Sequence, residues 1–155
     1  MPEATDKTPL VIDNDVFSHW RNSHEYVKQA LKDYFTYHKQ YPALTVITAF
    51  EALRGFERDA GGEITTAQVD NFNRLQRLIG SLIVLPFDLR AAGIAAQVFR
   101  SLTAKQQKGL ANDLFIASIA LANGCGVATR NVRDFETIEA ALPANLPPLY
   151  IARWK

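Results

Sequence analysis

Short apolar runs separated by longer amphipathic stretches form the main pattern along this chain. The runs are rich in β-branched residues, which is typical of short buried strands. They lie at residues 10–12, 43–46, 82–85, 127–129 and 149–152. Between them, apolar residues recur every three or four positions, the spacing of a helix with one face towards a core. These stretches predict helices at about 23–40, 47–58, 66–80, 88–102, 112–123 and 135–141, with a loop at 131–134.

Polar residues and one glycine mark the ends of several of these elements. Residues 13–15 (Asp-Asn-Asp) follow the first strand and predict a turn with helix-capping side chains. Thr65 or Thr66 predicts one N-cap and Asp88 another, and Gly124 predicts the end of the helix before it. Short strands alternating with helices predict an α/β fold with a mostly parallel sheet. We expect a single domain over residues 1–155, with its core at about 10–152.

Four polar residues stand beside or inside strongly apolar segments: Asp13, Glu51, Asp113 and Asn131. Asp13 and Asn131 directly follow predicted strands, and Glu51 and Asp113 lie near the starts of predicted helices. Ligands of parallel sheets bind at the carboxyl ends of the strands, so this topology gathers all four residues at one edge. Carboxylates at the margin of a core are costly unless they are paired or hold a cation. The pattern therefore indicates an acidic site for a hard divalent metal ion.

Each of these acids also has a purely structural interpretation. Asp13 and Asp15 can serve only as turn and capping residues. Glu51 can be a half-exposed helix residue paired with Arg54 or Arg58, and a carboxylate in the first turn of its helix, as at position 113, interacts favourably with the helix dipole. The shared environment of the set is what favours a site over these separate explanations.

Composition limits the possible functions. The chain has 155 residues, of which 48% are hydrophobic and 21% charged, as in an ordinary soluble globular protein. A net charge of +1 argues against binding nucleic acid by overall charge alone. Cys125 is the only cysteine, which excludes a disulfide within the chain and thiol-rich metal sites. Residues 1–7 do not resemble a secretory signal, and no apolar stretch approaches the ~18–20 residues of a membrane span. We therefore expect a cytoplasmic protein.

The remaining side chains suggest no other chemistry. The three histidines lack the spacing of a metal-binding pair, and no Ser-His-acid arrangement is evident. We expect the larger aromatic side chains to belong to the core rather than to a base-stacking surface: Phe50, Phe72, Phe99, Phe115 and Phe135.

Four sequence motifs together resemble the PIN-domain nucleases. Residues 11–16 (Val-Ile-Asp-Asn-Asp-Val) are similar to the opening motif, and residues 48–55, around Glu51, are similar to the second. Residues 112–120 resemble the third motif, and residues 128–135 resemble the fourth. The order of the motifs and the helices between them match as well. Within that family, the chain is most similar to the VapC-type toxins of bacterial toxin–antitoxin systems.

This resemblance implies a PIN-like three-layer α/β/α domain and an endoribonuclease that depends on Mg²⁺ or Mn²⁺. The implied metal ligands are Asp13, Glu51 and Asp113, with Asn131 as a further catalytic residue. Many relatives have Asp where Asn131 stands, so a second metal ion would be held more weakly here. Residues of lower rank are Asp15, Thr129 and Asp134 near the metal, and Arg130 and Arg133 as ligands of the substrate phosphate.

The resemblance also implies partners and a mechanism. A VapB-like antitoxin would hold the enzyme inactive, and the protein would form a homodimer. Helices 23–40 and 66–80 carry enough aromatic and aliphatic side chains to build a dimer interface, although the core of a monomer explains these side chains equally well. Water activated by the metal would attack the RNA phosphodiester bond and leave a 5′-phosphate and a 3′-hydroxyl. Cleavage is expected in single-stranded or loop regions, where bases can be splayed out. The RNA target itself is not encoded in any recognisable motif.

Two other functions fit parts of the sequence. Residues 10–16 are similar to the Asp-x-Asp-x-Val opening of haloacid-dehalogenase-type phosphatases, in which Asp13 would be a covalent nucleophile. That fold requires a later Lys and an acidic Gly-Asp loop, and neither occurs in a suitable context. The second alternative is a degenerate PIN domain that only binds RNA or protein. The presence of all three carboxylates argues against it.

Overall fold

A short parallel sheet forms the centre of the molecule. The computed structural model describes residues 7–58 and 64–155. β1 (Leu10–Ile12) pairs with β4 (Gly126–Thr129), and β4 pairs with β5 (Ile151–Arg153), all in parallel. β2 (Leu44–Thr45) pairs with β3 (Val84–Leu85) and is joined to β1 through a bridge between Val11 and Ala43. The strands therefore follow the order β3-β2-β1-β4-β5, which confirms the predicted α/β fold.

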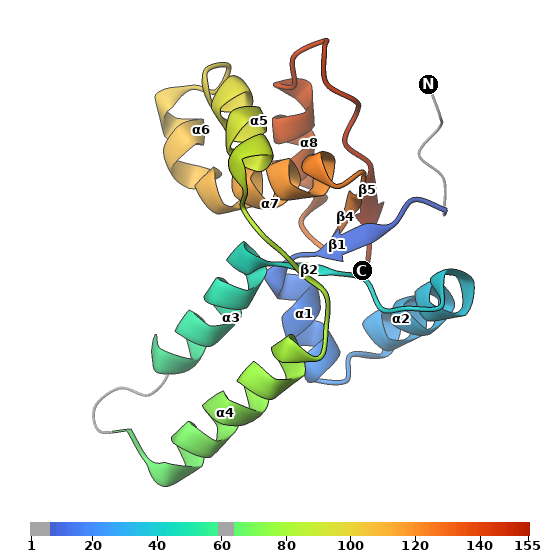
Figure 1. Cartoon of the computed structure of the whole chain (residues 1–155), viewed down its shortest axis with the longest axis vertical. Coiled ribbons are helices and arrows are strands. Elements are labelled where there is room, and N and C mark those ends of the chain that lie inside the picture. Colours follow the sequence, from blue (N-terminus) through green and yellow to red (C-terminus); the bar gives the residue numbers. More distant parts are fainter. Residues whose placement is uncertain (1–6, 59–63) are drawn as a thin grey trace.

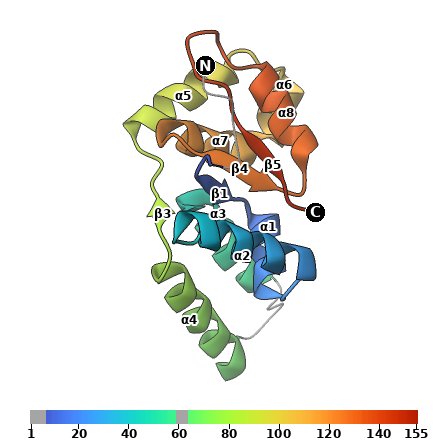
Figure 2. The same ribbon diagram turned by 90° about the vertical axis from the view of Figure 1, so that its right-hand side faces the viewer.

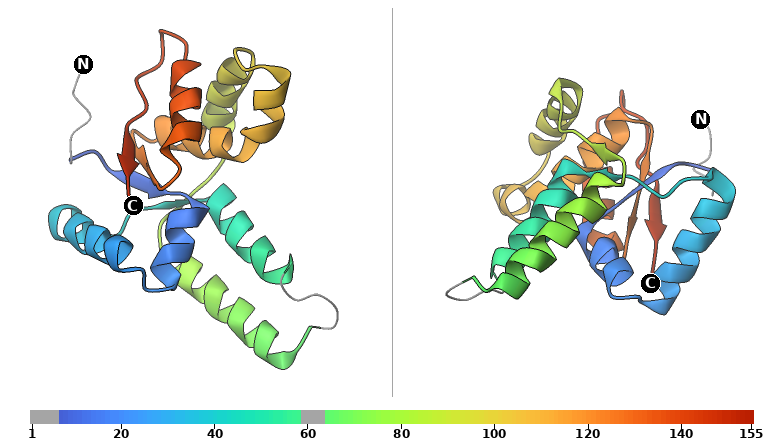
Figure 3. Two further views of the ribbon diagram at one scale, coloured as in Figure 1. Left: turned by 180° about the vertical axis from the view of Figure 1, so that it is seen from behind. Right: turned by 60° about the horizontal axis from the view of Figure 1, so that its bottom comes forward.

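Helices cover both faces of this sheet, as in a three-layer domain (Figures 1 and 2). The helices of the first half are α1 (Asn14–Arg21), α2 (Glu25–His38), α3 (Val46–Arg58) and α4 (Thr66–Gly80). The helices of the second half are α5 (Leu89–Phe99), α6 (Ala104–Gly109), α7 (Ala111–Ala122) and α8 (Val132–Ala140). In Figure 1 the second group lies above the strands and the first group below them. α3 and α4 lie side by side and extend away from the sheet (Figure 3).

Alternate side chains of the strands supply two separate hydrophobic cores. Val11 and Val127 point to the face covered by α5, α7 and α8. Leu10, Ile12 and Ala128 point to the opposite face, where they meet α1, α2 and α4. α7 contributes a nearly continuous buried segment, Leu114 and Ile116–Leu121. This pattern explains its apolar sequence, because a helix packed on most of its sides needs no polar face.

The predicted helix ends agree well with the structure where the signal is local. Asp13 caps α1, Asp88 caps α5, and Thr65 forms a capping box at α4. Gly124 follows α7 with a φ of 66°, the left-handed conformation that glycine adopts without strain.

Other boundaries differ from the prediction. α2 begins at Glu25 rather than at position 23, because Ser23 adopts a φ of 57°, which interrupts the helical conformation between α1 and α2. α8 begins at Val132, so most of the predicted loop 131–134 is its first turn. The short helices α1 and α6 were not predicted, because neither carries a full apolar repeat.

The prediction that the large aromatic residues belong to the core was wrong at Phe50 and Phe99. These side chains are 57% and 42% exposed, whereas Phe135 is fully buried as predicted. α3 packs through its neighbours on the adjacent face, including Ala52, which turns Phe50 towards solvent and next to the Arg54 guanidinium. None of the helices in residues 7–58 and 64–155 combines the length and the hydropathy that a transmembrane span requires.

Candidate functional site

Asp13 follows β1 directly and connects the strand to the first helix. Its Oδ1 accepts a hydrogen bond from the backbone N–H of Val16 (2.9 Å), which caps α1. Its Oδ2 accepts from the hydroxyl of Thr129 (2.5 Å), at the end of β4. Asp13 is only 6% exposed, and burial raises its pKa to about 6 in spite of these two bonds. The repulsion from Asp15 and Glu51 acts in the same direction as burial.

Thr129 holds the carboxylate of Asp13 in place through its hydroxyl. The residue is fully buried, and its Oγ1 also accepts a hydrogen bond from the backbone N–H of Asn131 (2.9 Å). It therefore positions Asp13 and Asn131 and does not itself line the cavity described below. Asn131 in turn donates from Nδ2 to the carboxylate of Asp134 (2.6 Å), in the first turn of α8.

Glu51 projects from α3, whose start is organised by buried threonines. The Thr45 hydroxyl accepts from the backbone N–H of Thr48 (3.1 Å), and the Thr48 hydroxyl donates to the carbonyl of Ile12 (3.2 Å). These bonds tie the first turn of α3 to the end of β1, next to Asp13. Burial raises the pKa of Glu51, whereas a hydrogen bond from the Asn112 side chain and the positive charge of Arg54 lower it. Thr45 and Thr48 were not singled out in the sequence, although they are β-branched polar residues at a strand-to-helix junction.

Asp113 lies in the first turn of α7 and has the largest resolved shift among these acids. Burial, followed by repulsion from the negative charges of Asp13, Asp134 and Glu51, raises its pKa to about 7. A carboxylate that holds its proton up to neutral pH in a polar cavity gains most from a nearby cation.

These side chains line one open cavity of about 490 Å³ at the carboxyl edge of the sheet. Its lining residues are Asp13, Asn14, Asp15, Ser18, Glu51, Asp113 and Asn131. Residues up to 118 positions apart, Asp13 and Asn131, thus meet where the parallel topology predicted. Asn14 and Ser18 are lining residues that the sequence did not indicate as part of the site.

The donor set of this cavity fits a hard divalent cation. Carboxylate and amide oxygens are the ligands that Mg²⁺ and Mn²⁺ prefer. The Oδ1 atom of Asn14 is buried and has no hydrogen-bond partner among the described residues, so it is an available oxygen. Within residues 7–58 and 64–155, however, no three His, Cys, Asp or Glu side chains are already gathered tightly enough to hold a metal ion. Binding would therefore require the carboxylates to rotate towards one another.

The two arginines proposed for the substrate phosphate have different positions. The guanidinium of Arg130 contacts Nε2 of His19, whose Nδ1 lies 2.8 Å from the carbonyl oxygen of Asp15. Because a guanidinium only donates, this bonding places the ring proton of His19 on Nδ1. Arg130 is thereby held beside a residue that lines the cavity. Arg133 is an exposed residue of α8 and does not line the cavity.

Comparison with known proteins identifies the family. A family model described as the PIN domain matches residues 10–140, which is most of the chain. This protein belongs to the PIN domain family. No curated relative matches the sequence significantly.

Several solved structures share the fold at low sequence identity. A chain of DNA-bound VapBC from Salmonella typhimurium is 23% identical, with a TM-score of 0.70, and the match covers 96% of this chain and 99% of that chain. A chain of FitAcB from Neisseria gonorrhoeae is 23% identical with a TM-score of 0.70, covering 93% and 96%. A chain of VapBC2 from Rickettsia felis, bound to a promoter DNA fragment, is 20% identical with a TM-score of 0.68, covering 94% and 98%.

Proposed function

We propose that this PIN domain is an endoribonuclease that depends on Mg²⁺ or Mn²⁺ and acts as the toxin of a VapBC-like toxin–antitoxin system. The observation that carries the proposal is that Asp13, Glu51 and Asp113 line one cavity, and that each pKa is raised above its ordinary value. Such a set of mutually repelling carboxylates is costly in an empty site and is stabilised by a divalent cation.

The metal ligands would be Asp13, Glu51 and Asp113, with the free oxygen of Asn14 within the same cavity. A bound divalent cation supplies charge neutralisation and lowers the pKa of a water for attack on phosphorus. The protein supplies positioning: Thr129 orients Asp13, Asn112 orients Glu51, and the Asn131–Asp134 hydrogen bond orders the start of α8. An activated water would serve as the nucleophile, so Asp13 would need no covalent role. The match of residues 10–140 to the PIN domain favours this function over a phosphatase.

Arg130 would meet the substrate phosphate at the mouth of the cavity. Its contact with His19 keeps the guanidinium close to the acidic site, and no carboxylate among the described residues forms an ion pair with it. The expected products are a 5′-phosphate and a 3′-hydroxyl, and the expected substrates are unpaired regions of RNA.

The proposed partner is a VapB-like antitoxin. The solved structures with this fold include VapBC and FitAcB assemblies, which supports the same kind of pairing here. Co-expression with the product of a short reading frame adjacent to the gene should yield a stable complex whose ribonuclease activity is lower than that of the toxin alone. Full activity in the presence of that product would contradict the pairing.

Cleavage of a fluorogenic single-stranded RNA tests the enzymatic function. We expect cleavage by the purified protein with Mg²⁺ or Mn²⁺, and its loss in EDTA and in Asp113→Asn. Asp70→Asn is the matched control, because Asp70 is an exposed acid on α4 outside the cavity. Equal loss in both variants would show that the loss does not come from the metal site.

One observation favours a second function. Since the described carboxylates are not already gathered around a metal position, the chain can also be a PIN domain that only binds RNA or protein. Calorimetry with Mn²⁺ separates the two functions. Absence of Mn²⁺ binding together with absence of cleavage would overturn the nuclease and favour the binding role.

A further inference from the structure

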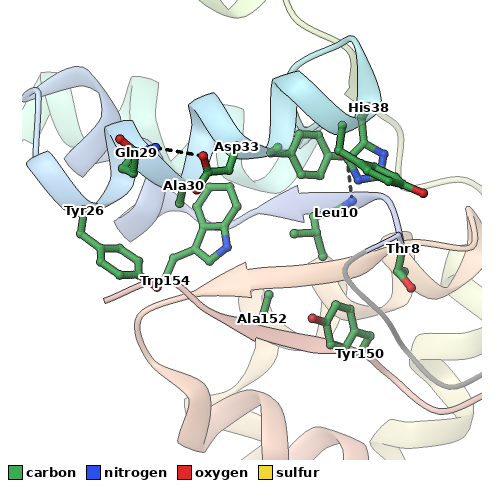
Figure 4. A pocket seen from close by; sticks show the side chains of 12 residues that line it. Thr8, Leu10, Tyr26, Gln29, Ala30, Asp33, His38, Tyr150, Ala152 and Trp154 are labelled. Carbon is green, nitrogen blue, oxygen red and sulfur yellow. Dashed lines mark hydrogen bonds between the residues drawn. The ribbon is translucent and has the colours of Figure 1, made fainter.

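A second cavity lies between α2 and β5, apart from the carboxylate cavity. It has a volume of about 420 Å³, and we call it the α2–β5 pocket. Its lining residues are Thr8, Leu10, Tyr26, Gln29, Ala30, Asp33, Tyr34, Tyr37, His38, Tyr150, Ala152 and Trp154. None of them lines the carboxylate cavity. Figure 4 shows the side chains of α2 facing those of β5 across this space.

Aromatic rings form most of the wall of the pocket. Tyr34 stacks on His38 (centroids 4.0 Å apart) and meets Trp154 edge to face (6.5 Å), and Tyr37 lies edge to face with His38 (4.8 Å). In Figure 4 the indole of Trp154 lies below Asp33, and the ring of Tyr26 lies beside it. Aromatic faces attract cations, with arginine and lysine as the usual protein ligands.

The charge of the pocket also favours a cationic ligand. Asp33 is the only carboxylate among the lining residues, and no lysine or arginine is among them. Its Oδ1 accepts a hydrogen bond from Gln29 (2.9 Å), which holds the carboxylate in place. In addition, Nε2 of His38 is buried without a hydrogen-bond partner among the described residues, and in the tautomer that carries its proton on Nδ1 it would accept a hydrogen bond from a donor group. A basic side chain supplies both the positive charge and the donors.

β5, the strand beside the pocket, has one edge that no strand among the described residues pairs with, and we call it the free edge. β5 is the last strand in the order, and its backbone bonds to β4 involve the carbonyl of Tyr150 and the N–H of Trp154. In a parallel ladder the alternate residues, Ile151 and Arg153, turn their backbone groups away from β4. The carbonyl of Arg153 accepts a long hydrogen bond from the hydroxyl of Tyr26 (3.5 Å), which an added strand would replace. Such an edge accepts an extended peptide as an added strand, with alternate side chains entering the neighbouring pocket.

We propose that the α2–β5 pocket binds an arginine or lysine side chain of an extended segment of a partner protein, and that this segment pairs with the free edge of β5. The negative charge of Asp33 and the absence of basic lining residues favour this ligand over RNA, whose phosphates require cations. The site shares no residue with the proposed nuclease centre. The result of a binding test at this site is therefore independent of whether the protein is a nuclease.

The test is a fluorescence titration of the full-length protein in EDTA. Trp20→Phe leaves Trp154 as the only tryptophan reporter. The probes are the blocked peptide Val-Thr-Arg-Thr-Val and the same peptide with neutral citrulline in place of arginine. We expect the arginine peptide to bind roughly threefold more tightly or better, the range of an exposed cation–π contact. Equal binding of the two peptides, or no response of Trp154, would overturn the proposal.

Variants locate the binding in the pocket and on the edge. Asp33→Asn should reduce the preference for arginine over citrulline, whereas Asp70→Asn, which replaces another exposed acid, on α4, should keep it. Hydrogen exchange of the Ile151 and Arg153 amides should slow when the arginine peptide is bound. Unchanged exchange would refute strand addition. Oligouridylate is the competing ligand. If it displaces the peptide, and if Asp33→Asn does not weaken the binding of oligouridylate, the pocket binds RNA instead.

Discussion

Asp13 joins the fold to the candidate site, because its carboxylate caps α1 while it also faces the acidic cavity. One oxygen is committed to Val16, and the other is held by Thr129 across the sheet. The orientation of this carboxylate is thus set by backbone and side-chain donors from two elements. Groups of this kind behind a metal ligand commonly decide how well the ligand binds.

Replacement of Thr129 by valine tests that support. Thr129→Val keeps the buried shape but removes the hydrogen bond that lowers the pKa of Asp13. The Mn²⁺ affinity at neutral pH should therefore fall about tenfold, as for other groups that orient metal ligands. Calorimetric titration measures the change. Thr36→Val, which removes the exposed hydroxyl bonded to Lys32, is the control, and an unchanged affinity in Thr129→Val would contradict the role.

The raised pKa of Asp113 predicts how pH affects the protein without metal. In the unfolded chain this carboxyl loses its proton near pH 3.8, whereas in the folded protein it keeps it until about pH 7. The folded state therefore binds the proton more tightly, and its stability falls as pH rises through that interval. Asp113→Asn removes the titrating group.

Thermal unfolding in EDTA measures this effect. The Tm of Asp113→Asn minus that of the wild type should increase between about pH 4 and about pH 7 and level off above that value. A difference that stays constant over this range would show that Asp113 has an ordinary pKa in the folded protein.

At the scale of the elements, the contact between β4 and β5 depends on the absence of a side chain at Gly126. A Cβ atom at this position would lie 2.7 Å from the carbonyl oxygen of Tyr150, which is a backbone atom and cannot move aside freely. The close approach brings Tyr150 to the floor of the α2–β5 pocket.

Gly126→Ala should therefore destabilise the protein by about 1–3 kcal/mol, the usual cost of overpacking a core. Gly93→Ala is the matched control, since a Cβ at this exposed position of α5 meets nothing within 4 Å. It should stabilise the helix by about 0.5–1 kcal/mol, because alanine favours helices over glycine. Urea unfolding measures both changes. Equal effects of the two substitutions would contradict the close approach.

At the scale of the whole molecule, apolar side chains remain on the surface around the start of α5. Leu89 is 89% exposed, and Ile83 and Phe87 are 50% and 36% exposed within the same short segment. Monomeric proteins rarely expose a contiguous apolar patch, and such patches often mark interfaces. This segment differs from helices 23–40 and 66–80, which the sequence indicated for a homodimer.

Sedimentation equilibrium distinguishes the two surfaces. If the protein is a homodimer through the α5 segment, Leu89→Asp should weaken self-association at least about tenfold, because a buried charge would remain unpaired. Val69→Asp places the same charge on α4, at a side chain that is 45% exposed, and should have little effect. The reverse result would assign the interface to the helix that the sequence indicated.

How much the sequence predicted depends on the range of the interactions involved. The caps at Thr65 and Asp88 and the glycine after α7 rest on contacts within a few residues, so the local pattern was sufficient. The gathering of the acids at one edge also followed, because parallel topology brings the carboxyl ends of strands together. The exposure of Phe50 could not be predicted, since a helical repeat does not say which of two adjacent faces meets the core.

The sequence by itself determined the alternation of strands and helices and the order of the PIN-like motifs. The tertiary structure decided which side chains support the site. Thr129 reaches Asp13 across 116 positions, and the free oxygen of Asn14 depends on the packing around it. The α2–β5 pocket likewise exists only because a helix from the first quarter of the chain faces its last strand. Contacts between distant segments depend on how the layers of the fold pack. This packing cannot be predicted from a local pattern of residues.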